Sequence, residues 1–263
     1  ITAFDAFMIE TEKIKKSGCA IDNEEFAKGI ICIAVPIFDY EGNAVASMGI
    51  STLTLYDDID SLIKNTDFSK LYSDNARLLS IGFSVDENKL IDSYYDFLAS
   101  EARLASLVGI AKKDIPEKHW NNLSRTLTTL DNYKGLISWS GTAFEYLMPN
   151  INVKRYKGSL LDESLKFSVE SQKAYSKKFG LPWGISESAY NIKDLKENYQ
   201  YKAFGIPWLG LKRGLEEDMV VSPYSVFLSL NYVPKEAIEN LRRLQKEEML
   251  DKYGFYESID YTI

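Results

Sequence analysis

The 263-residue sequence contains almost no cysteine or histidine, and this scarcity excludes several kinds of site. The two cysteines, Cys19 and Cys32, are too few for a disulfide framework and lack zinc-site spacing, which favours a reducing compartment. The single histidine, His119, excludes most histidine-centred metal sites, and a Ser-His-Asp triad would have to use it. Its place beside Trp120 is more typical of a packed or surface helix residue. We therefore expect no metal ion and no cofactor.

Long apolar runs and basic clusters are also missing. The longest apolar stretch, GIICIAVPIF at residues 29–38, is far shorter than the ~18–20 residues of a membrane span and contains a proline. We expect no direct membrane contact. No basic patch is large enough for DNA or RNA, so we expect no nucleic-acid partner. The chain starts at Ile1 without a methionine or a signal-peptide pattern, which predicts a fragment of a longer protein.

The sequence is otherwise that of a globular protein with a change of character near residue 65. At 45% hydrophobic and 26% charged residues, it has enough apolar material for a real core. Residues 1–65 carry five lysines and eleven acidic residues, whereas residues 66–263 hold 26 basic and 27 acidic residues. Every tryptophan and every arginine lies in the second part. These differences predict two domains, 1–65 and 66–263.

The first part has the pattern of a small α+β fold. Residues 5–16 predict a weakly amphipathic helix that Gly18 ends. Residues 29–38 and 44–53 predict two strands, and the DYEGN turn between them is a hairpin signal. Residues 57–64 predict a short helix.

Residues 12–51 read EKIKKSGCAIDNEEFAKGIICIAVPIFDYEGNAVASMGIS. They resemble the C-terminal half of the ligand-sensing domain of IclR-type transcriptional regulators, and the resemblance covers about residues 1–64. It implies a GAF-like α+β fragment in which Cys32 lines an effector pocket, whereas the simpler interpretation of Cys32 is a buried strand residue. The DNA-binding helix-turn-helix and the first half of the sensor are absent from the sequence.

The second part is expected to be mainly α. Its capping residues and prolines mark the ends of several helices separated by loops rich in aromatic residues and glycine, which indicates helical hairpins around a groove. LLSIGFSV, at residues 78–85, predicts a short strand before them. The expected helices run from Asp92 to about Lys112, from Thr142 through Leu147, from Asp162 to just before Gly180, and onward from Pro223 and from Pro234.

Two glutamates stand out in this part. Glu187 lies in LPWGISESAY (residues 181–190) between two serines and after a rigid Pro-Trp-Gly turn. Glu101 lies in SYYDFLASEARLAS (residues 93–106) among small and aromatic residues. Two carboxylates in such surroundings suggest acid/base or nucleophilic chemistry on a sugar. Ser186, Ser188 and Asn191 are expected to keep Glu187 ionised.

Six long motifs follow one another in the second part. They are LYSDNARLLSIGFSVDENKLIDSYYDFLASEARLASLVGIAKKDIPEKHW, SWSGTAFEYLMP, GSLLDES, LPWGISESAYN, NYQYKAFGIPWLGLKRGL and YGFYESIDYT. Together they resemble the glucoamylase-like domain of cyclic β-1,2-glucan synthases, from about residue 67 to the end. The resemblance implies a partial α/α toroid, a β-1,2-linked glucan as partner, and a retaining transglycosylase that closes a linear glucan into a ring. It makes Glu101 the general acid/base and Glu187 the nucleophile.

The same resemblance places the segment in the cytoplasm, within a membrane-bound synthase at the inner face of the cell membrane. Candidate substrate-binding residues are Tyr94, Asp96, Arg103, Trp139, Glu145, Trp183 and Tyr190. Trp139, Trp183 and Tyr190 offer aromatic faces for glucose rings. Glu145 follows Thr142 by three positions, so it is either a capping-box residue or a sugar ligand. Asp96 and Arg103 form either a structural ion pair or part of the groove.

Three functions therefore compete, and a fourth interpretation remains. The first is the retaining transglycosylase, and the second is an inverting β-1,2-glucan hydrolase on the same scaffold, which needs a wider carboxyl separation of about 6.5–9.5 Å. The third is a ligand-sensing module derived from the first segment. The fourth is that two unrelated fragments have been joined near Asn65.

Overall fold

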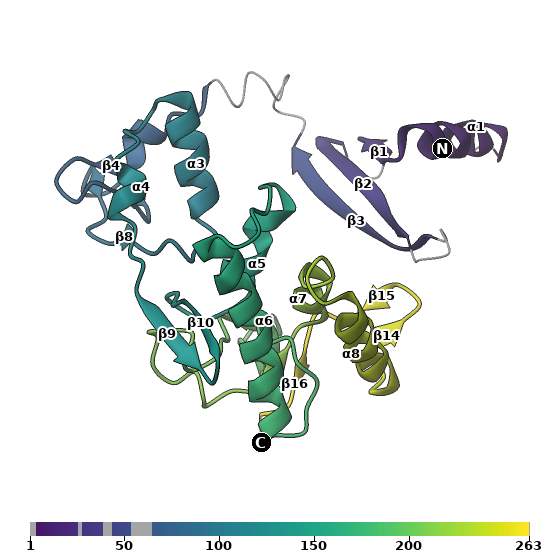
Figure 1. Cartoon of the computed structure of the whole chain (residues 1–263). Coiled ribbons are helices and arrows are strands. Elements are labelled where there is room, and N and C mark those ends of the chain that lie inside the picture. The colour runs from purple at the N-terminus through teal and green to yellow at the C-terminus, as the bar shows by residue number, and fades with distance from the viewer. Residues whose placement is uncertain (1–3, 26–27, 39–43, 54–64, 263) are drawn as a thin grey trace. The chain divides into compact units, whose positions relative to one another are not determined.

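The structure is a computed structural model that describes residues 4–25, 28–38, 44–53 and 65–262. The chain divides into two compact units, Ile1–Asp67 and Phe68–Ile263. Figure 1 colours the first unit from purple to blue and the second from blue through green to yellow. Within the described ranges, no helix is long and apolar enough to cross a bilayer.

Among its described residues, the first unit forms a helix and a three-stranded antiparallel sheet, of which the sequence predicted the helix and the two longer strands but not the first, short one. Helix α1 (Phe4–Ser17) ends at Gly18, whose φ of +73° is a conformation that glycine adopts without strain. Strands β1 (Ala20–Asn23), β2 (Ile30–Phe38) and β3 (Ala44–Leu53) pair in the order β1-β2-β3. Cys32 lies on β2 and is partly exposed. The predicted DYEGN turn and the helix of residues 57–64 lie outside the described residues.

The second unit combines helices with short antiparallel sheets. Its helices are α3 (Arg103–Lys112), α4 (His119–Asn122), α5 (Ala143–Leu147), α6 (Leu160–Lys178), α7 (Pro223–Leu228) and α8 (Pro234–Lys246), with 3-10 turns η1 (Phe68–Leu71) and η2 (Met148–Ile151). Its strands are β4 (Tyr72–Ser73), β5 (Leu78–Ser80), β6 (Phe83–Ser84), β7 (Lys89–Leu90), β8 (Tyr94–Tyr95), β9 (Leu127–Leu130), β10 (Tyr133–Leu136), β11 (Ser188–Lys193), β12 (Tyr199–Lys202), β13 (Val220–Val221), β14 (Leu250–Asp251), β15 (Gly254–Phe255) and β16 (Ile259–Asp260). The sheets are β4-β5-β8, β6-β7, β9-β10, β11-β12, β13-β16 and β14-β15.

This mixture departs from a mainly α fold. The described residues form seven α-helices and several small sheets, so the helix and strand contents are mixed. The toroid of inner and outer helices therefore remains a prediction. The helix expected from Asp92 begins only at Arg103, because Tyr94 and Tyr95 pair with β5 instead. The strand expected over residues 78–85 is likewise broken into β5 and β6.

Most of the predicted helix starts are confirmed. Thr142 caps α5, and Pro223 and Pro234 occupy the first turns of α7 and α8, where a missing N–H costs nothing. The cap of α6 is Ser159 rather than Asp162, which lies three residues further on and receives an N–H from Gly158. Helix α6 is the longest helix of the unit and packs along β10 (Figure 1).

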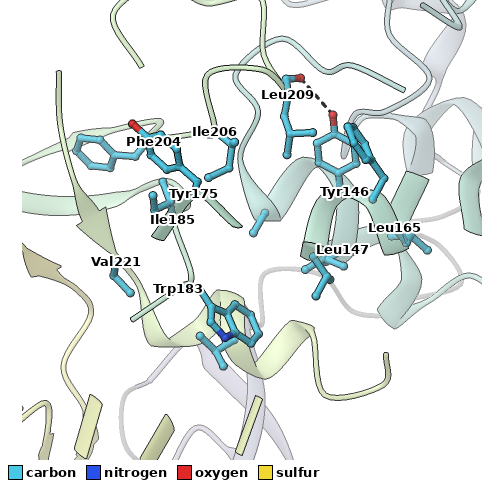
Figure 2. Close-up of a cluster of buried hydrophobic side chains, with 14 of the residues drawn as sticks. Tyr146, Leu147, Leu165, Tyr175, Trp183, Ile185, Phe204, Ile206, Leu209 and Val221 are labelled. Carbon is cyan, nitrogen blue, oxygen red and sulfur yellow. Dashed lines mark hydrogen bonds between the residues drawn. The ribbon is translucent and has the colours of Figure 1, made fainter. Parts of the chain in front are cut away.

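The core of the second unit contains buried side chains of α5 and α6, of α7 and α8, and of the segment that connects β12 to β13. Figure 2 shows Tyr146 beside Leu209, with its hydroxyl directed at the Leu209 carbonyl. That hydroxyl lies 2.8 Å from the Leu136 carbonyl oxygen and 3.2 Å from the Leu209 carbonyl oxygen, which share its one proton. The backbone of Gly205 packs closely against that of Ser140. A Cβ added to Gly205 would lie only 1.8 Å from the Ser140 carbonyl oxygen.

The single histidine is a structural residue, as its simpler interpretation predicted. His119 is fully buried, with Nδ1 3.1 Å from the Arg77 carbonyl and Nε2 2.9 Å from the Ser106 hydroxyl. Since a carbonyl can only accept, Nδ1 carries the proton and Nε2 accepts from Ser106. Burial lowers the pKa of His119, so the neutral ring is the form that fits this site.

We expect acid to weaken the second unit through His119. Because the folded-state pKa lies below the unfolded value of about 6.5, the unfolded chain binds the proton more tightly. The contribution of His119 to the free energy of unfolding is therefore fully present above that pH and is lost as the pH drops below it. The total loss is about 1.4 kcal/mol for each pKa unit by which the folded-state value lies below the unfolded one. The chain has no other histidine, so one NMR ring signal reports this titration. A ring that titrates at or above pH 6.5 in the folded protein would contradict the prediction.

Candidate active site

A cavity of about 630 Å³ brings together most of the residues proposed from the sequence. Six of the nine candidates border it, including Glu101 and Glu187, which are 86 positions apart in the chain. Its lining residues are Leu78, Ile81, Ser93, Tyr94, Tyr95, Asp96, Phe97, Ser100, Glu101, Trp139, Ser140, Thr142, Glu145 and Glu187. Three segments therefore meet here: the stretch from β5 to the start of α3, the loop before α5, and the turn that leads into β11.

Glu101 lies in a turn before α3 and not inside a helix. Ser100 organises this turn, because its hydroxyl accepts the N–H of Ala102 at 3.2 Å and donates to Glu101 Oε2 at 3.2 Å. A turn residue can direct its side chain into a cavity without following the face of a helix. Among the described residues, the hydrogen-bond partner of the Glu101 carboxylate is the neutral hydroxyl of Ser100.

Glu187 lies where the chain enters β11. Ile185 forms an isolated antiparallel bridge with Val221 two residues before it, and Ser188 opens the strand immediately after it. Ser186 is fully buried, and its Oγ accepts the N–H of Phe144 from α5 at 3.1 Å. The backbone on both sides of Glu187 is thus fixed by pairing with other elements.

The electrostatics of Glu187 differ from the sequence expectation. Burial raises the pKa of Glu187, and the charges of Glu101 and Glu145 raise it further. The neighbours expected to keep it ionised do not bond its carboxylate: Ser186 accepts the N–H of Phe144, the Ser188 hydroxyl has no partner, and the N–H of Asn191 donates to Asp260. No hydrogen bond to the Glu187 carboxylate occurs among the described residues. The three expected neighbours therefore supply no hydrogen bond that lowers the pKa of Glu187, and burial followed by repulsion from Glu101 and Glu145 sets the direction of its shift.

Glu145 is the capping-box residue of α5. Its Oε2 accepts from Ser138 Oγ at 2.8 Å, Thr142 N at 2.9 Å and Thr142 Oγ1 at 3.2 Å, and its Oε1 accepts from Ser140 N at 3.0 Å. Burial raises the pKa of Glu145, and these donors lower it in part. The capping interpretation is confirmed. Since both oxygens are already bonded, Glu145 shapes the cavity wall by fixing residues 138–142.

Arg103 lies beneath the cavity instead of lining it. Only 4% of the residue is exposed, and its guanidinium donates to the carbonyls of Ser100 and Glu145 at 2.8 Å and of Tyr146 at 2.7 Å. Burial lowers its pKa to about 10. It forms no ion pair with Asp96. Arg103 therefore connects the Glu101 turn to the last carbonyls of α5, where a positive charge is favourable, and it is not among the residues that line the cavity.

The proposed aromatic residues separate into two groups. Trp139 is 59% exposed and borders the cavity, as does Tyr94, whose hydroxyl donates to Asp92. Trp183 is 9% exposed and belongs to the core, as Figure 2 shows. Tyr190 packs edge-on against Phe204 and lies outside the cavity lining. Neither Trp183 nor Tyr190 borders this cavity, so a sugar-binding role for them stays a prediction; an aromatic side chain near a motif is equally suited to a core.

Sequence reasoning missed several lining residues. Tyr95, Phe97 and Ser100 lie in the same motif as Glu101, and their closeness to it in the sequence is the signal that could have indicated them. Ser140 and Thr142 belong to the cap of α5 and carry no sequence signal of their own beyond it. Within the described residues, no group of three or more His, Cys, Asp or Glu side chains could hold a metal ion.

Comparison with known proteins identifies relatives of both units. Residues 93–263 match the family model described as "Putative glucoamylase", and residues 1–59 match the model described as "Bacterial transcriptional regulator IclR C-terminal". The cyclic beta-(1,2)-glucan synthase NdvB of Rhizobium meliloti (strain 1021) is 41% identical over 230 residues, which is 88% of this chain. That match is longer than the second unit, so it also includes part of the first.

Two Escherichia coli (strain K12) regulators resemble only a fifth of the chain. The HTH-type transcriptional regulator KdgR is 40% identical over 55 residues, and the DNA-binding transcriptional repressor YiaJ is 43% identical over 54 residues. The chain spans 8% of the length of the synthase, 21% of KdgR and 19% of YiaJ. These similarities confirm both resemblances seen in the sequence and support a carbohydrate-active role. With its family model matched over residues 93–263, the chain belongs to this glucoamylase-like family.

Proposed function

We propose that the cavity binds β-1,2-linked glucan and that Glu101 and Glu187 perform a retaining transglycosylation on it. The observation that carries this proposal is the convergence of the two carboxylates on one cavity from segments far apart in the sequence. The name of the 41% identical synthase gives the linkage of the substrate. The exposed face of Trp139 at the cavity wall provides a stacking surface for a glucose ring.

In the first step, a Glu187 oxygen attacks the anomeric carbon and forms a covalent glycosyl ester. The bond between that carbon and the linking oxygen breaks, and Glu101 gives its proton to the departing oxygen. In the second step, Glu101 takes a proton from a hydroxyl of an incoming sugar, whose oxygen displaces Glu187 and restores the β linkage. An intramolecular hydroxyl closes a ring, an external sugar extends a chain, and water gives hydrolysis.

The mutual repulsion of the carboxylates suits this exchange of one proton. The charge of Glu101 contributes to the raised pKa of Glu187, so the cavity disfavours two negative charges at once. With the proton on Glu101, that repulsion is absent and Glu187 is free to be the anionic nucleophile. Assigning Glu101 as the acid and Glu187 as the nucleophile follows the family motifs.

The test is the reaction of the full chain with β-1,2-linked gluco-oligosaccharides of defined length, followed by NMR and mass spectrometry. We expect the first-formed reducing end to be the β anomer, with longer or cyclic products alongside the cleaved ones. β-1,3-linked oligosaccharides of the same length serve as the control. An α anomer at first appearance would instead identify an inverting hydrolase. Absence of both turnover and binding would remove the proposed function.

The raised pKa of Glu187 makes a prediction for the pH dependence of the first step. Because Glu187 must be ionised to attack, the rate falls as the pH drops through its pKa, which lies above that of an ordinary glutamate. A β-1,2-linked diglucosyl fluoride isolates this limb, since fluoride leaves without protonation. In Glu101→Gln the neighbouring charge is gone, so the acidic limb should shift to lower pH. A limb that stays in place would show that Glu101 and Glu187 are not electrostatically coupled.

A further inference from the structure

Tyr224 reaches the backbone of Glu187 from helix α7. Its hydroxyl lies 2.7 Å from Ser186 Oγ and 3.0 Å from the Glu187 carbonyl oxygen. Its ring stands edge-on to Phe144, with ring centroids 6.4 Å apart. Tyr224 is not among the residues that line the cavity, so it contacts the segment that carries Glu187 and not the substrate.

The same contacts connect Glu187 to helix α5. Ser186 Oγ accepts the N–H of Phe144 at 3.1 Å, so Ser186 joins α5 to Tyr224. The Phe144 amide belongs to the first turn of α5 and has no intrahelical partner, and Ser186 supplies its acceptor. A buried serine that is bonded on two sides has one orientation, and this fixes the peptide that bears Glu187.

Helix α5 also holds the segment that carries Glu101. Arg103 donates to the carbonyls of Glu145 and Tyr146 at one end of α5 and to the carbonyl of Ser100, next to Glu101. One short helix is therefore tied to both carboxylate-bearing segments, through Arg103 on one side and through Ser186 on the other. Movement of Arg103 or Ser186 would change the distance between the Glu101 and Glu187 carboxylates, on which a two-carboxylate mechanism depends.

We propose that Tyr224 is a positioning residue, which holds the Glu187 backbone against α5 and so sets the distance of Glu187 from Glu101. Its consequence for catalysis rests on the proposed function. The positioning itself rests on the hydrogen bonds of Tyr224, Ser186 and Phe144. Loss of the Tyr224 hydroxyl leaves the aromatic packing against Phe144 in place, so the substitution Tyr224→Phe isolates the two hydrogen bonds.

The first experiment measures amide hydrogen exchange in the full chain and needs no substrate. In Tyr224→Phe, Ser186 loses the hydroxyl that orients it as the acceptor of the Phe144 N–H. We therefore expect the Phe144 amide to exchange roughly tenfold faster, a factor that corresponds to the strength of one typical hydrogen bond. The amides of Ser138 and Trp183, which donate to Leu209 and to Asn240, should be unchanged. An unchanged Phe144 amide would overturn the proposal, as would a uniform acceleration of all three amides, which would indicate general destabilisation.

The second experiment compares kinetics on β-1,2-linked gluco-oligosaccharides. We expect Tyr224→Phe to lower kcat by about 10- to 100-fold with KM nearly unchanged, because the nucleophile is misplaced while the sugar-binding wall is intact. Tyr261→Phe is the matched control: it removes a partly buried hydroxyl that bonds Glu247 in the same unit, away from the cavity lining. Equal losses in both variants, or a rise in KM alone, would overturn the proposal. If the unmodified chain neither binds nor converts the glucan, the proposed function fails, and the exchange experiment still decides whether Tyr224 positions Glu187.

Discussion

Replacing Glu187 by glutamine is expected to stop both hydrolysis and transfer of β-1,2-glucan, with a loss on the order of 10⁴-fold or more. Glutamine keeps the shape of the side chain but cannot form the covalent glycosyl ester. The substitution also removes the like charge that Glu101 opposes, so the fold should be retained or stabilised. Turnover is followed by chromatography of the products, and glucan binding by calorimetry.

Two further variants show whether the loss of activity in Glu187→Gln is specific to the nucleophile. Glu163→Gln changes an exposed glutamate of α6 that pairs with Lys166, so activity should remain within about twofold of the unmodified chain. Glu101→Gln should retain the first step on substrates with a fluoride leaving group and lose it on the glucan itself, since only the glucan needs protonation to depart. Retained glucan turnover in Glu187→Gln would remove Glu187 as the nucleophile.

Replacing Gly205 by alanine is expected to have the largest effect on folding. The new Cβ would lie 1.8 Å from the Ser140 carbonyl oxygen and 2.7 Å from the Gly141 carbonyl carbon. Both atoms are backbone, so no side-chain rotation relieves the clash, and the two segments must separate. We expect a loss of about 3 kcal/mol or more, or failure to fold. Because residues 138–142 form one wall of the cavity, any folded Gly205→Ala protein should also lose glucan affinity.

The matched control is Gly82→Ala. A Cβ on Gly82 would meet only the end of the Ile91 side chain, at 3.1 Å, and that end can move by a few tenths of an ångström. We expect this change to alter stability by less than about 1 kcal/mol. Urea unfolding followed by tryptophan fluorescence measures both variants, since all four tryptophans lie in the second unit. Similar midpoints for the two variants would show that residues 205 and 140 do not pack as described.

Local signals in the sequence predicted what depends on local chemistry. The Thr142 cap and the helix-opening prolines are defined by residues close in the chain, and each is found where expected. Strand β2 follows from an apolar run rich in isoleucine and valine. Glu101 and Glu187 came from the family motifs, because no local rule separates a functional glutamate from a solvated one.

What the sequence could not predict depends on contacts between distant segments. Strand β8 exists only because Tyr94 and Tyr95 pair with β5, and that pairing overrides the helix propensity of the following residues. Arg103 is buried because carbonyls from α5 receive its guanidinium, a partnership that no spacing in the sequence reveals. The raised pKa of Glu187 likewise depends first on its burial and then on a charge 86 positions away.

The central claim is that Glu187 becomes covalently bonded to the sugar in a cavity that it shares with Glu101. The most direct test is intact-protein mass spectrometry of the Glu101→Ala chain after reaction with a β-1,2-linked diglucosyl fluoride. Fluoride leaves without help, and without the general base the ester is hydrolysed slowly, so it accumulates. We predict a mass increase of one diglucosyl group, located by peptide mapping on Glu187 and absent in Glu101→Ala/Glu187→Gln. No adduct, or an adduct on any other residue, would contradict the account.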